Sequence, residues 1–413
     1  MRAESESLNR LETLALVVCQ PLAQLSNQAL LPSLGAMRAD LDLSYAELGA
    51  VVAAFGVTRL VVDLPAGNLA SRLNPRSVLI AALSLSALGS LAGVFANSGW
   101  QVALVRLLIG VGSAVAQAML LAWIVGGSGQ AARARALSYS EAFFSSAGLV
   151  IPVLGGLLAG PLGWRVAFAM GAVAAFGGAL AIVWCTRASS AAHAVGLTRS
   201  TDPTQQAERV GWLDLRVGGK VLLASYLATF GVFFCRNGML NSVVPVLGSE
   251  RFGFAPLEIG TLFSVINAIG IGAVLLGGRC ADRFGRYRAL MPSLALLAVS
   301  QALLLTVRDP ATYILVGLMQ GVACFVNPIP TIVMGDALTP RLRARGIAVY
   351  RAICDVAILS APASMGLAIQ SAGFGAAEML NFLVSAVVVV GVYVLYAGTR
   401  AHKPVLLAQD ARG

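Results

Sequence analysis

Charged residues are scarce in this chain of 413 residues: only 12% are Asp, Glu, Lys or Arg, while 58% are hydrophobic. A soluble protein of this length needs more charge to cover its surface, so the lipid bilayer must be the solvent for much of the chain. The apolar runs are continuous and lack the alternation of period two that a membrane β-barrel requires. The sequence therefore predicts an all-α membrane protein.

Histidines, paired cysteines and nucleotide-binding motifs are equally scarce. His193 and His402 are the only histidines and lie in predicted loops, so a histidine relay inside the membrane is not expected. None of the six cysteines forms a CxxC pair, which indicates neither a disulfide framework nor a metal cluster. The GGSGQ segment at 126–130 follows no strand and is not a phosphate-binding loop, so neither ATP nor another cofactor is expected.

Twelve apolar stretches are long enough to cross a bilayer, which takes about 20 residues per helix. The first is too long for a signal-peptide core and lacks a convincing cleavage site, so it is interpreted as an uncleaved helix. In chain order the predicted spans are 12–36, 47–70, 77–96, 101–125, 138–159, 165–185, 221–247, 256–278, 289–307, 311–334, 347–370 and 376–397.

The distribution of positive charge predicts the orientation of these spans. If the N-terminus is cytoplasmic, 21 of the 29 Lys and Arg residues fall on the cytoplasmic side, four outside and four within spans. This asymmetry is the positive-inside rule, and it predicts that both termini are cytoplasmic. The net charge of +10 then reflects topology, and no nucleic acid partner is expected.

A basic loop occurs twice, since residues 67–76 read GNLASRLNPR and residues 278–288 read GRCADRFGRYR, 211 positions later. Similar offsets relate Pro152 to Pro362 and Pro32 to Pro245. This near-constant offset predicts two duplicated halves related by an axis along the membrane normal. The long polar interval at 187–219 is interpreted as a cytoplasmic linker between an N-terminal six-helix bundle, 1–186, and a C-terminal one, 220–413.

The repeated loops resemble the loop signature of the major facilitator superfamily. The copy GGRCADRFGRYR resembles the signature in full, whereas GNLASRLNPR has Ser71 and Asn74 where Asp and Gly are usual. LVRLLIGVGSA at 104–114 is similar to the family's fourth-helix motif and includes Arg106.

Two further motifs extend this resemblance over essentially the whole chain. IPVLGG at 151–156 resembles the fifth-helix motif associated with exporters, although Ile151 replaces the usual Gly, and GWRVAF at 163–168 resembles the entry to helix 6. The resemblance implies twelve helices in two pseudo-symmetric six-helix bundles and transport by alternating access.

Charged side chains inside the spans cost about 2.5–3.5 kcal/mol each at the bilayer centre, so they need a partner or a function. Arg59 and Asp63 share one face of helix 2, and Arg351 and Asp355 share one face of helix 11. The family architecture brings these helices together, which allows the pairs Asp63–Arg351 and Arg59–Asp355. We expect this quartet to close the cytoplasmic side in the outward-facing state and to part in the inward-facing state. Pairs within each helix are the alternative.

The second basic loop implies a related contact. By the resemblance, Asp282, with Arg283 beside it, docks in one state near Glu141 at the start of helix 5, where the helix dipole favours a carboxylate. Ser71 has no such charge, so the latch of the first half is expected to be weaker. Purely topogenic charge is the alternative. Four acids sit at span ends, where we expect water to reach them: Glu12, Glu47, Glu258 and Glu378.

Helices 1, 4, 7 and 10 line the central cavity in this family. Interhelical hydrogen bonding is the alternative role for the amides among their polar residues. Because Arg106 and Arg236 have no obvious acid beside them, the expected ligand is an organic anion, and the aromatic residues of helix 7 suit a ring or apolar portion. The candidate substrate-binding residues are Gln20, Gln24, Asn27, Arg106, Phe233, Arg236, Asn237, Gln320 and Asn327.

These observations predict a monomeric secondary active transporter of a small organic molecule in a bacterial inner membrane. A proton is the expected coupling ion, carried by Asp63, Glu141 or Asp355, because a desolvated carboxylate without its arginine partner binds a proton more readily. Uniport stays open, and IPVLGG slightly favours efflux over uptake.

The alternatives are an uptake permease, a multidrug exporter, and a membrane receptor or sensor. A receptor is expected to carry a soluble output domain, and the chain offers none. An enzyme is not expected, because no Ser/His/Asp set or HExxH motif is present.

Overall fold

The computed structural model describes residues 10–72, 74–127, 130–186, 219–337 and 343–397, and every regular element in these ranges is a helix. Within them, eleven helices or helix groups are long and apolar enough to cross a membrane. The predicted span 289–307 corresponds to α13 (Arg286–Leu304), whose apolar part is shorter than the others. The prediction of an all-α membrane protein is confirmed.

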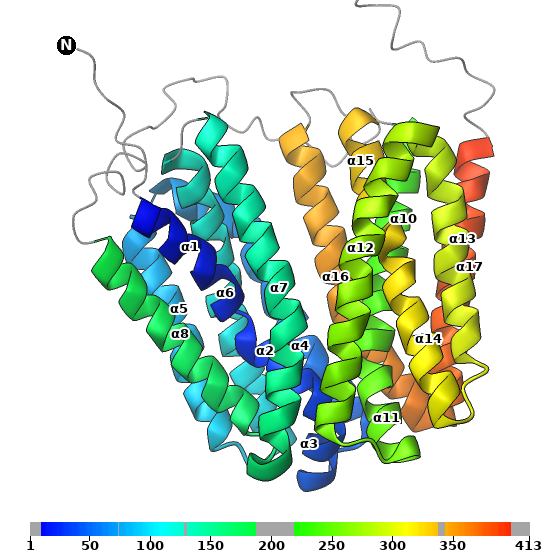
Figure 1. Ribbon diagram of the computed structural model, residues 1–413, viewed down its shortest axis with the longest axis horizontal. Helices are drawn as coiled ribbons and strands as arrows, with labels where there is room; N and C mark the ends of the chain where they lie inside the picture. Colours follow the sequence, from blue (N-terminus) through cyan, green and yellow to red (C-terminus); the bar gives the residue numbers. More distant parts are fainter. Residues whose placement is uncertain (1–9, 73, 128–129, 187–218, 338–342, 398–413) are drawn as a thin grey trace, which may run out of the picture.

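The helices form two bundles that lie side by side (Figure 1). The first bundle contains α1 (Arg10–Leu22), α2 (Leu25–Leu30), η1 (Leu31–Ser33), α3 (Leu34–Asp40), α4 (Tyr45–Arg72), α5 (Pro75–Val94), α6 (Gly99–Gly127), α7 (Gln130–Leu162) and α8 (Val166–Cys185).

The second bundle contains α10 (Gly219–Gly238), η4 (Met239–Val243), α11 (Val244–Phe252), α12 (Pro256–Phe284), α13, α14 (Pro310–Ala323), η5 (Cys324–Val326), α15 (Pro328–Ala337), α16 (Arg343–Ala372) and α17 (Phe374–Ala397). The predicted linker, 187–219, lies outside the described residues except for its last position, at which α10 begins.

The first span of each bundle is interrupted, where the sequence predicts continuous helices. In the first bundle a 3₁₀ turn, η1, contains Pro32; in the second a π-helical turn, η4, precedes Pro245. Proline has no backbone N–H and blocks the regular hydrogen-bond ladder, which explains the local change of helix type. Because these prolines are related by the repeat, both bundles carry the irregularity at corresponding depth.

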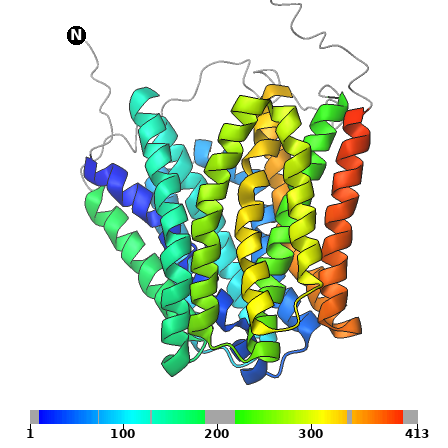
Figure 2. The ribbon, with the colours of Figure 1, turned by 45° about the vertical axis from the view of Figure 1, so that its right-hand side comes forward.

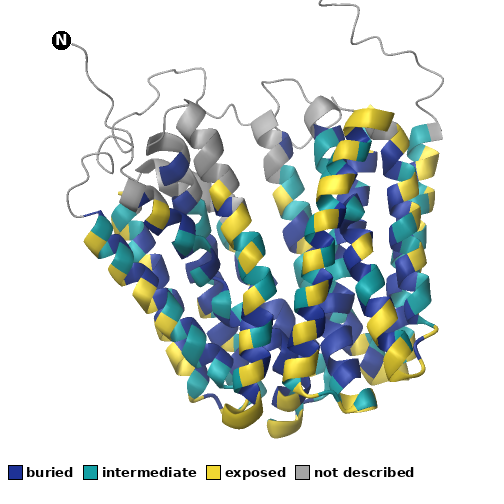
Figure 3. Cartoon of the chain, in the orientation of Figure 1, coloured by how far each residue is buried: buried dark blue, intermediate teal, exposed yellow. Residues whose placement is uncertain are grey.

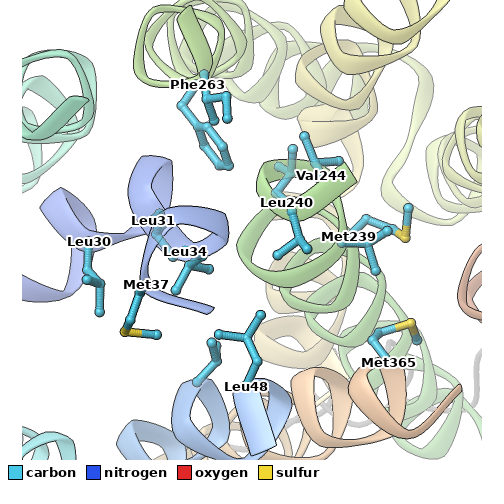
Figure 4. Close-up of a cluster of buried hydrophobic side chains, with 14 of the residues drawn as sticks. Leu30, Leu31, Leu34, Met37, Leu48, Met239, Leu240, Val244, Phe263 and Met365 are labelled. Carbon is cyan, nitrogen blue, oxygen red and sulfur yellow. The ribbon is translucent and has the colours of Figure 1, made fainter. Parts of the chain in front are cut away.

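The two bundles share one core at one face of the molecule and have separate cores at the other. We call the side where α1 begins and α17 ends the terminal face, and the side that carries α3 and α11 the closed face (Figures 1 and 2). The shared core joins Leu31 and Met37 of the first bundle to Leu240, Phe263 and Met365 of the second (Figure 4). Three further clusters each belong to one bundle alone.

Burial follows the same arrangement (Figure 3), with the buried residues concentrated between the bundles toward the closed face. Large apolar side chains are also exposed on helix surfaces, such as Val173 at 75% and Trp184 at 79%. Exposed apolar side chains of this size are expected of helices whose solvent is a bilayer.

Candidate functional site

Arg106 of α6 is buried in the first bundle and is held by neutral groups. Its Nη2 donates to Asn27 Oδ1 at 2.9 Å and to the Val52 carbonyl oxygen at 3.4 Å. Its guanidinium carbon lies 5.8 Å from the centre of the Phe55 ring. Its Nε has no hydrogen-bond partner among the described residues. The structure therefore brings the predicted residues Asn27 and Arg106 together and leaves the guanidinium with an unused donor.

Arg236 of α10 is half-buried in the second bundle. It lines a small cavity that also contains Gln320 of α14 and Asn327, which follows η5. Its Nη2 lies 3.4 Å from Asn267 Oδ1 of α12. Three predicted substrate-binding residues therefore meet at one cavity, while Asn267 was not predicted.

Gln320 uses its amide within a buried hydrogen-bond network. Its Nε2 donates to the Ser300 carbonyl oxygen at 3.0 Å, and its Oε1 accepts from Gln301 Nε2 at 2.9 Å. Asn381 Nδ2 of α17 donates to Gln301 Oε1 at 2.7 Å. These bonds favour the interhelical role for Gln320. Gln301 and Asn381 were not predicted, because single amides on apolar helices carry no periodic signal.

The other predicted amides also contact protein groups. Gln20 of α1 accepts a hydrogen bond from the Ser140 hydroxyl of α7, and Gln24 is buried. Asn237 Nδ2 donates to the Phe233 carbonyl oxygen at 2.8 Å, one turn back in α10. The Phe233 ring meets Tyr350 of α16 edge-on, with centroids 6.4 Å apart.

Arg59 of α4 and Asp355 of α16 form an ion pair between the bundles, with Nε and Oδ1 3.6 Å apart. Of the other two members of the predicted quartet, Arg351 has an exposed side chain, and the Asp63 side chain, like that of Glu141, lies outside the described part of the structure. The hypothesis expects Arg59 and Asp355 to part when the bundles separate at the cytoplasmic side. The pair is formed in this structure while the cores at the terminal face are separate, and its parting stays a prediction.

The repeated loops differ as their sequences do. Asn74 is the N-cap of α5, and its side chain accepts from the Arg76 backbone N–H at 3.0 Å, whereas Gly285 adopts a left-handed backbone with φ of 91°. Only glycine takes this conformation readily, so the two turns are not interchangeable. Asp282 and Arg283 are exposed in this conformation.

A second cross-bundle contact lies at the closed face and was not predicted. Arg38 Nε of the first bundle lies 2.5 Å from Glu250 Oε1 of the second, and the Tyr45 hydroxyl donates to Glu250 Oε2 at 2.5 Å. The Arg38 guanidinium carbon lies 4.3 Å from the centre of the Tyr45 ring. We call Arg38, Tyr45 and Glu250 the closed-face latch. Such residues at helix ends look like ordinary surface charge in a sequence.

The four acids at span ends fall into two classes. Glu47 and Glu258 are exposed and accept hydrogen bonds from the backbone N–H groups of Ser44 and Ala255. Glu12 and Glu378 are only 7% and 5% exposed, so the expectation that water reaches them is wrong. Both lie on helix faces that pack into the protein.

Comparison with known proteins identifies a family. The sequence model of the Major Facilitator Superfamily matches residues 16–306 and 238–411. Multidrug resistance protein 2 of Bacillus subtilis (strain 168) is 23% identical over 345 residues, which cover 82% of each chain.

Solved structures share the fold. A bacterial homolog of the human lysosomal transporter Spinster, in an inward-facing and unoccupied conformation, superposes with a TM-score of 0.78 at 14% identity, over 95% of this chain and 98% of that one. The human organic anion transporter MFSD10 superposes with a TM-score of 0.64 at 18% identity, over 93% of this chain and 99% of that one.

Proposed function

The chain belongs to the major facilitator superfamily, and from this premise we propose that it exports a small organic anion by proton-coupled alternating access. Its relatives and its fold are those of membrane transporters, and it is not an enzyme. The substrate class, the direction and the coupling ion are the parts that we propose.

The observation that carries the anion assignment is the pair of arginines without acids. Within the described residues, neither Arg106 nor Arg236 has a carboxylate within 4.0 Å, whereas Arg38, Arg59 and Arg165 each have one. A buried cation without a counter-charge is costly. A carboxylate ligand supplies the missing charge through charge-assisted hydrogen bonds, which are stronger than bonds to neutral acceptors.

The two arginines belong to different bundles, which suits a ligand bound between them. Arg106 keeps an unused Nε, and Arg236 lines a cavity together with Asn327. The Phe55 ring of α4 lies beside Arg106, and Phe233 shares α10 with Arg236, so both rings suit an apolar portion of the ligand. A monocarboxylate with one ring matches the chemistry of these side chains, since its charge pairs with an arginine and its ring with a phenylalanine.

Efflux and proton coupling have their own observations behind them. IPVLGG resembles the exporter motif, and the Bacillus relative is named for multidrug resistance. Asp355 is a buried carboxylate whose partner Arg59 lies on the other bundle, so relative motion of the bundles changes its environment. By the positive-inside rule we place the terminal face in the cytoplasm of a bacterium, with the protein a monomer of the inner membrane.

The test is uptake into proteoliposomes with an imposed pH gradient, using a panel of aromatic carboxylates and, separately, the cationic dye ethidium. We expect transport of carboxylates, and a loss of at least about tenfold in Arg106→Gln and Arg236→Gln, since one charged hydrogen bond is worth about 1.5–3 kcal/mol. Arg308→Gln, which removes an exposed arginine from a loop, is the matched control and should transport normally.

The alternative is a multidrug exporter, which the name of the Bacillus relative favours and which the cationic dye probes. Transport of ethidium alone, or full carboxylate transport by both arginine variants, rejects the anion assignment. Carboxylate transport that ignores the pH gradient retains the anion and rejects the proton.

A further inference from the structure

Pro152 leaves a backbone carbonyl of α7 without its helical partner. In a regular helix the N–H of residue 152 would donate to the carbonyl oxygen of Gly148, but proline has no N–H. In a membrane little water is available to replace the lost bond, and a neighbouring helix can supply the donor. The question is which group of the neighbouring helix does so.

Asn267 of α12, in the other bundle, supplies that bond. Its Nδ2 donates to the Gly148 oxygen at 3.0 Å, and its Oδ1 accepts from Arg236 Nη2 at 3.4 Å. The roles leave one orientation of the amide, since a carbonyl only accepts and a guanidinium only donates. We call Arg236, Asn267 and Gly148 the amide bridge. It connects a proposed ligand-binding arginine to the contact between the bundles.

The repeat contains an internal control for the packing role of this position. Residue 56 of α4 lies 211 positions before Asn267, and at the offset of 210 that relates Pro152 to Pro362 the position equivalent to Gly148 is Ile358 of α16. That position holds Gly56, and a Cβ there would lie 3.0 Å from Leu359 Cα and 3.2 Å from Ile358 C. The corresponding α4–α16 contact therefore forms without any amide side chain.

A closer contact, between a glycine and a proline oxygen, occurs in both interfaces about two helical turns from this position. A Cβ at Gly49 would lie 2.6 Å from the Pro362 oxygen, and a Cβ at Gly260, its repeat equivalent, would crowd the Pro152 oxygen. The packing of a glycine against the backbone oxygen of a proline is therefore enough to bring the two helices of each interface together. Asn267 is an addition to this frame, which separates its function from simple packing.

We propose that Asn267 is a positioning residue that links the occupancy of Arg236 to the contact between α7 and α12. This inference rests on the proposed function. A carboxylate that binds Arg236 through Nη2 takes the N–H that Asn267 Oδ1 accepts, because a charged acceptor is the stronger one. The amide then loses the bond that orients it toward Gly148, and the α7–α12 contact weakens. By reciprocity, separation of the two helices favours anion binding.

The test is a double-mutant cycle that needs no ligand. Spin labels at Ala39 and Ala255, which are exposed on opposite bundles at the closed face, report whether that face is closed. The half-buried Cys185 and Cys280 are first replaced by Ser, since the other cysteines are buried. The measured quantity is the ratio of short to long label distances in nanodiscs.

Asn267→Ala should lower this ratio about fivefold, the effect of one lost net hydrogen bond. In a Pro152→Ala background the helix recovers the N–H for Gly148, so Asn267→Ala should change the ratio less than twofold. Asn267→Asp keeps an acceptor for Arg236 but has no donor for Gly148, and should also lower the ratio only when Pro152 is present. Arg236→Met should have no further effect once Asn267 is Ala.

Equal effects of Asn267→Ala in both backgrounds, or no effect in either, would overturn the bridge. Melting temperatures of all variants show whether they fold. If Asn267→Ala does not fold, Asn267→Gly replaces it, because it reproduces the glycine that α4 has at the equivalent position, Gly56. These outcomes are independent of transport. A failed cycle with normal carboxylate export rejects the bridge alone, and an intact cycle without anion transport rejects the substrate assignment alone.

Discussion

Breaking the closed-face latch should open the closed face. Glu250 accepts from Arg38 and Tyr45, both of the other bundle, at 2.5 Å each, and its side chain is 21% exposed. Hydrogen bonds to charged groups contribute about 1.5–3 kcal/mol when buried, and exposed ion pairs about 0.2–1 kcal/mol. For this partly exposed site we take about 1–2 kcal/mol, which is a factor of about 5–30 in a two-state ratio.

We therefore expect Glu250→Gln to shift the Ala39–Ala255 label distances toward long values by that factor, and Tyr45→Phe by a smaller one. The control is Asp40→Asn. Asp40 accepts from Arg165 at 2.7 Å on the same face, but both residues belong to the first bundle, so the distances should not change. The reasoning is refuted if Glu250→Gln and Asp40→Asn give the same distribution, because the latch would then be surface charge without consequence.

Two further predictions concern helix packing and helix capping. Gly366→Ala should push α4 away from α16, because a Cβ at residue 366 would lie 3.0 Å from Gly49 Cα and 3.2 Å from Gly49 N. We expect a cost of about 1–3 kcal/mol in stability, measured as a lower melting temperature. Gly375→Ala is the control and should be neutral, since a Cβ there meets nothing within 4 Å. Asp309 caps α14, and the Thr312 backbone N–H lowers the pKa of its carboxyl below 3.8, so its stabilisation should be complete above that pH and lost as pH falls through the lower folded value. Asp309→Ala should remove this acid-sensitive part, and an unchanged pH–melting curve in detergent would contradict the assignment.

Hydropathy and the repeat predicted most of the fold, because both reflect constraints that act on whole helices. A span must be apolar over its length, and a duplicated half keeps its prolines and basic loops in register. The interruptions at η1 and η4 were missed although Pro32 and Pro245 were noticed. A proline shows that the ladder must change, but whether the chain tightens to 3₁₀ or widens to π depends on the neighbouring helices.

A contact in the site could be predicted where its two residues lie on one helix face or at the same depth in the membrane. The Arg59–Asp355 contact follows from the spacing of four on two antiparallel helices. Asn267 could not be recognised in this way, because its acceptor is the backbone oxygen of Gly148 on another helix. That oxygen lacks its helical donor only because Pro152, four residues after Gly148, has no N–H. The signal was nevertheless in the repeat, as a glycine exchanged for an amide at an otherwise matched position.

The two interfaces between the bundles differ in electrostatic balance, and this difference indicates which of them can respond to an anion. The α4–α16 interface contains a cation with its own acid, Arg59 with Asp355, whereas the repeat-related positions in α12 and α7 are Gly270 and Ser145. The α7–α12 interface instead touches an arginine that is bonded to a neutral amide. An anion has little to gain at a cation that already has its acid, but it can displace a neutral acceptor. An effector shifts an equilibrium only by its differential affinity for the two states. If the substrate is the anion that we propose, its binding should therefore act on the α7–α12 interface rather than on the Arg59–Asp355 pair of α4 and α16.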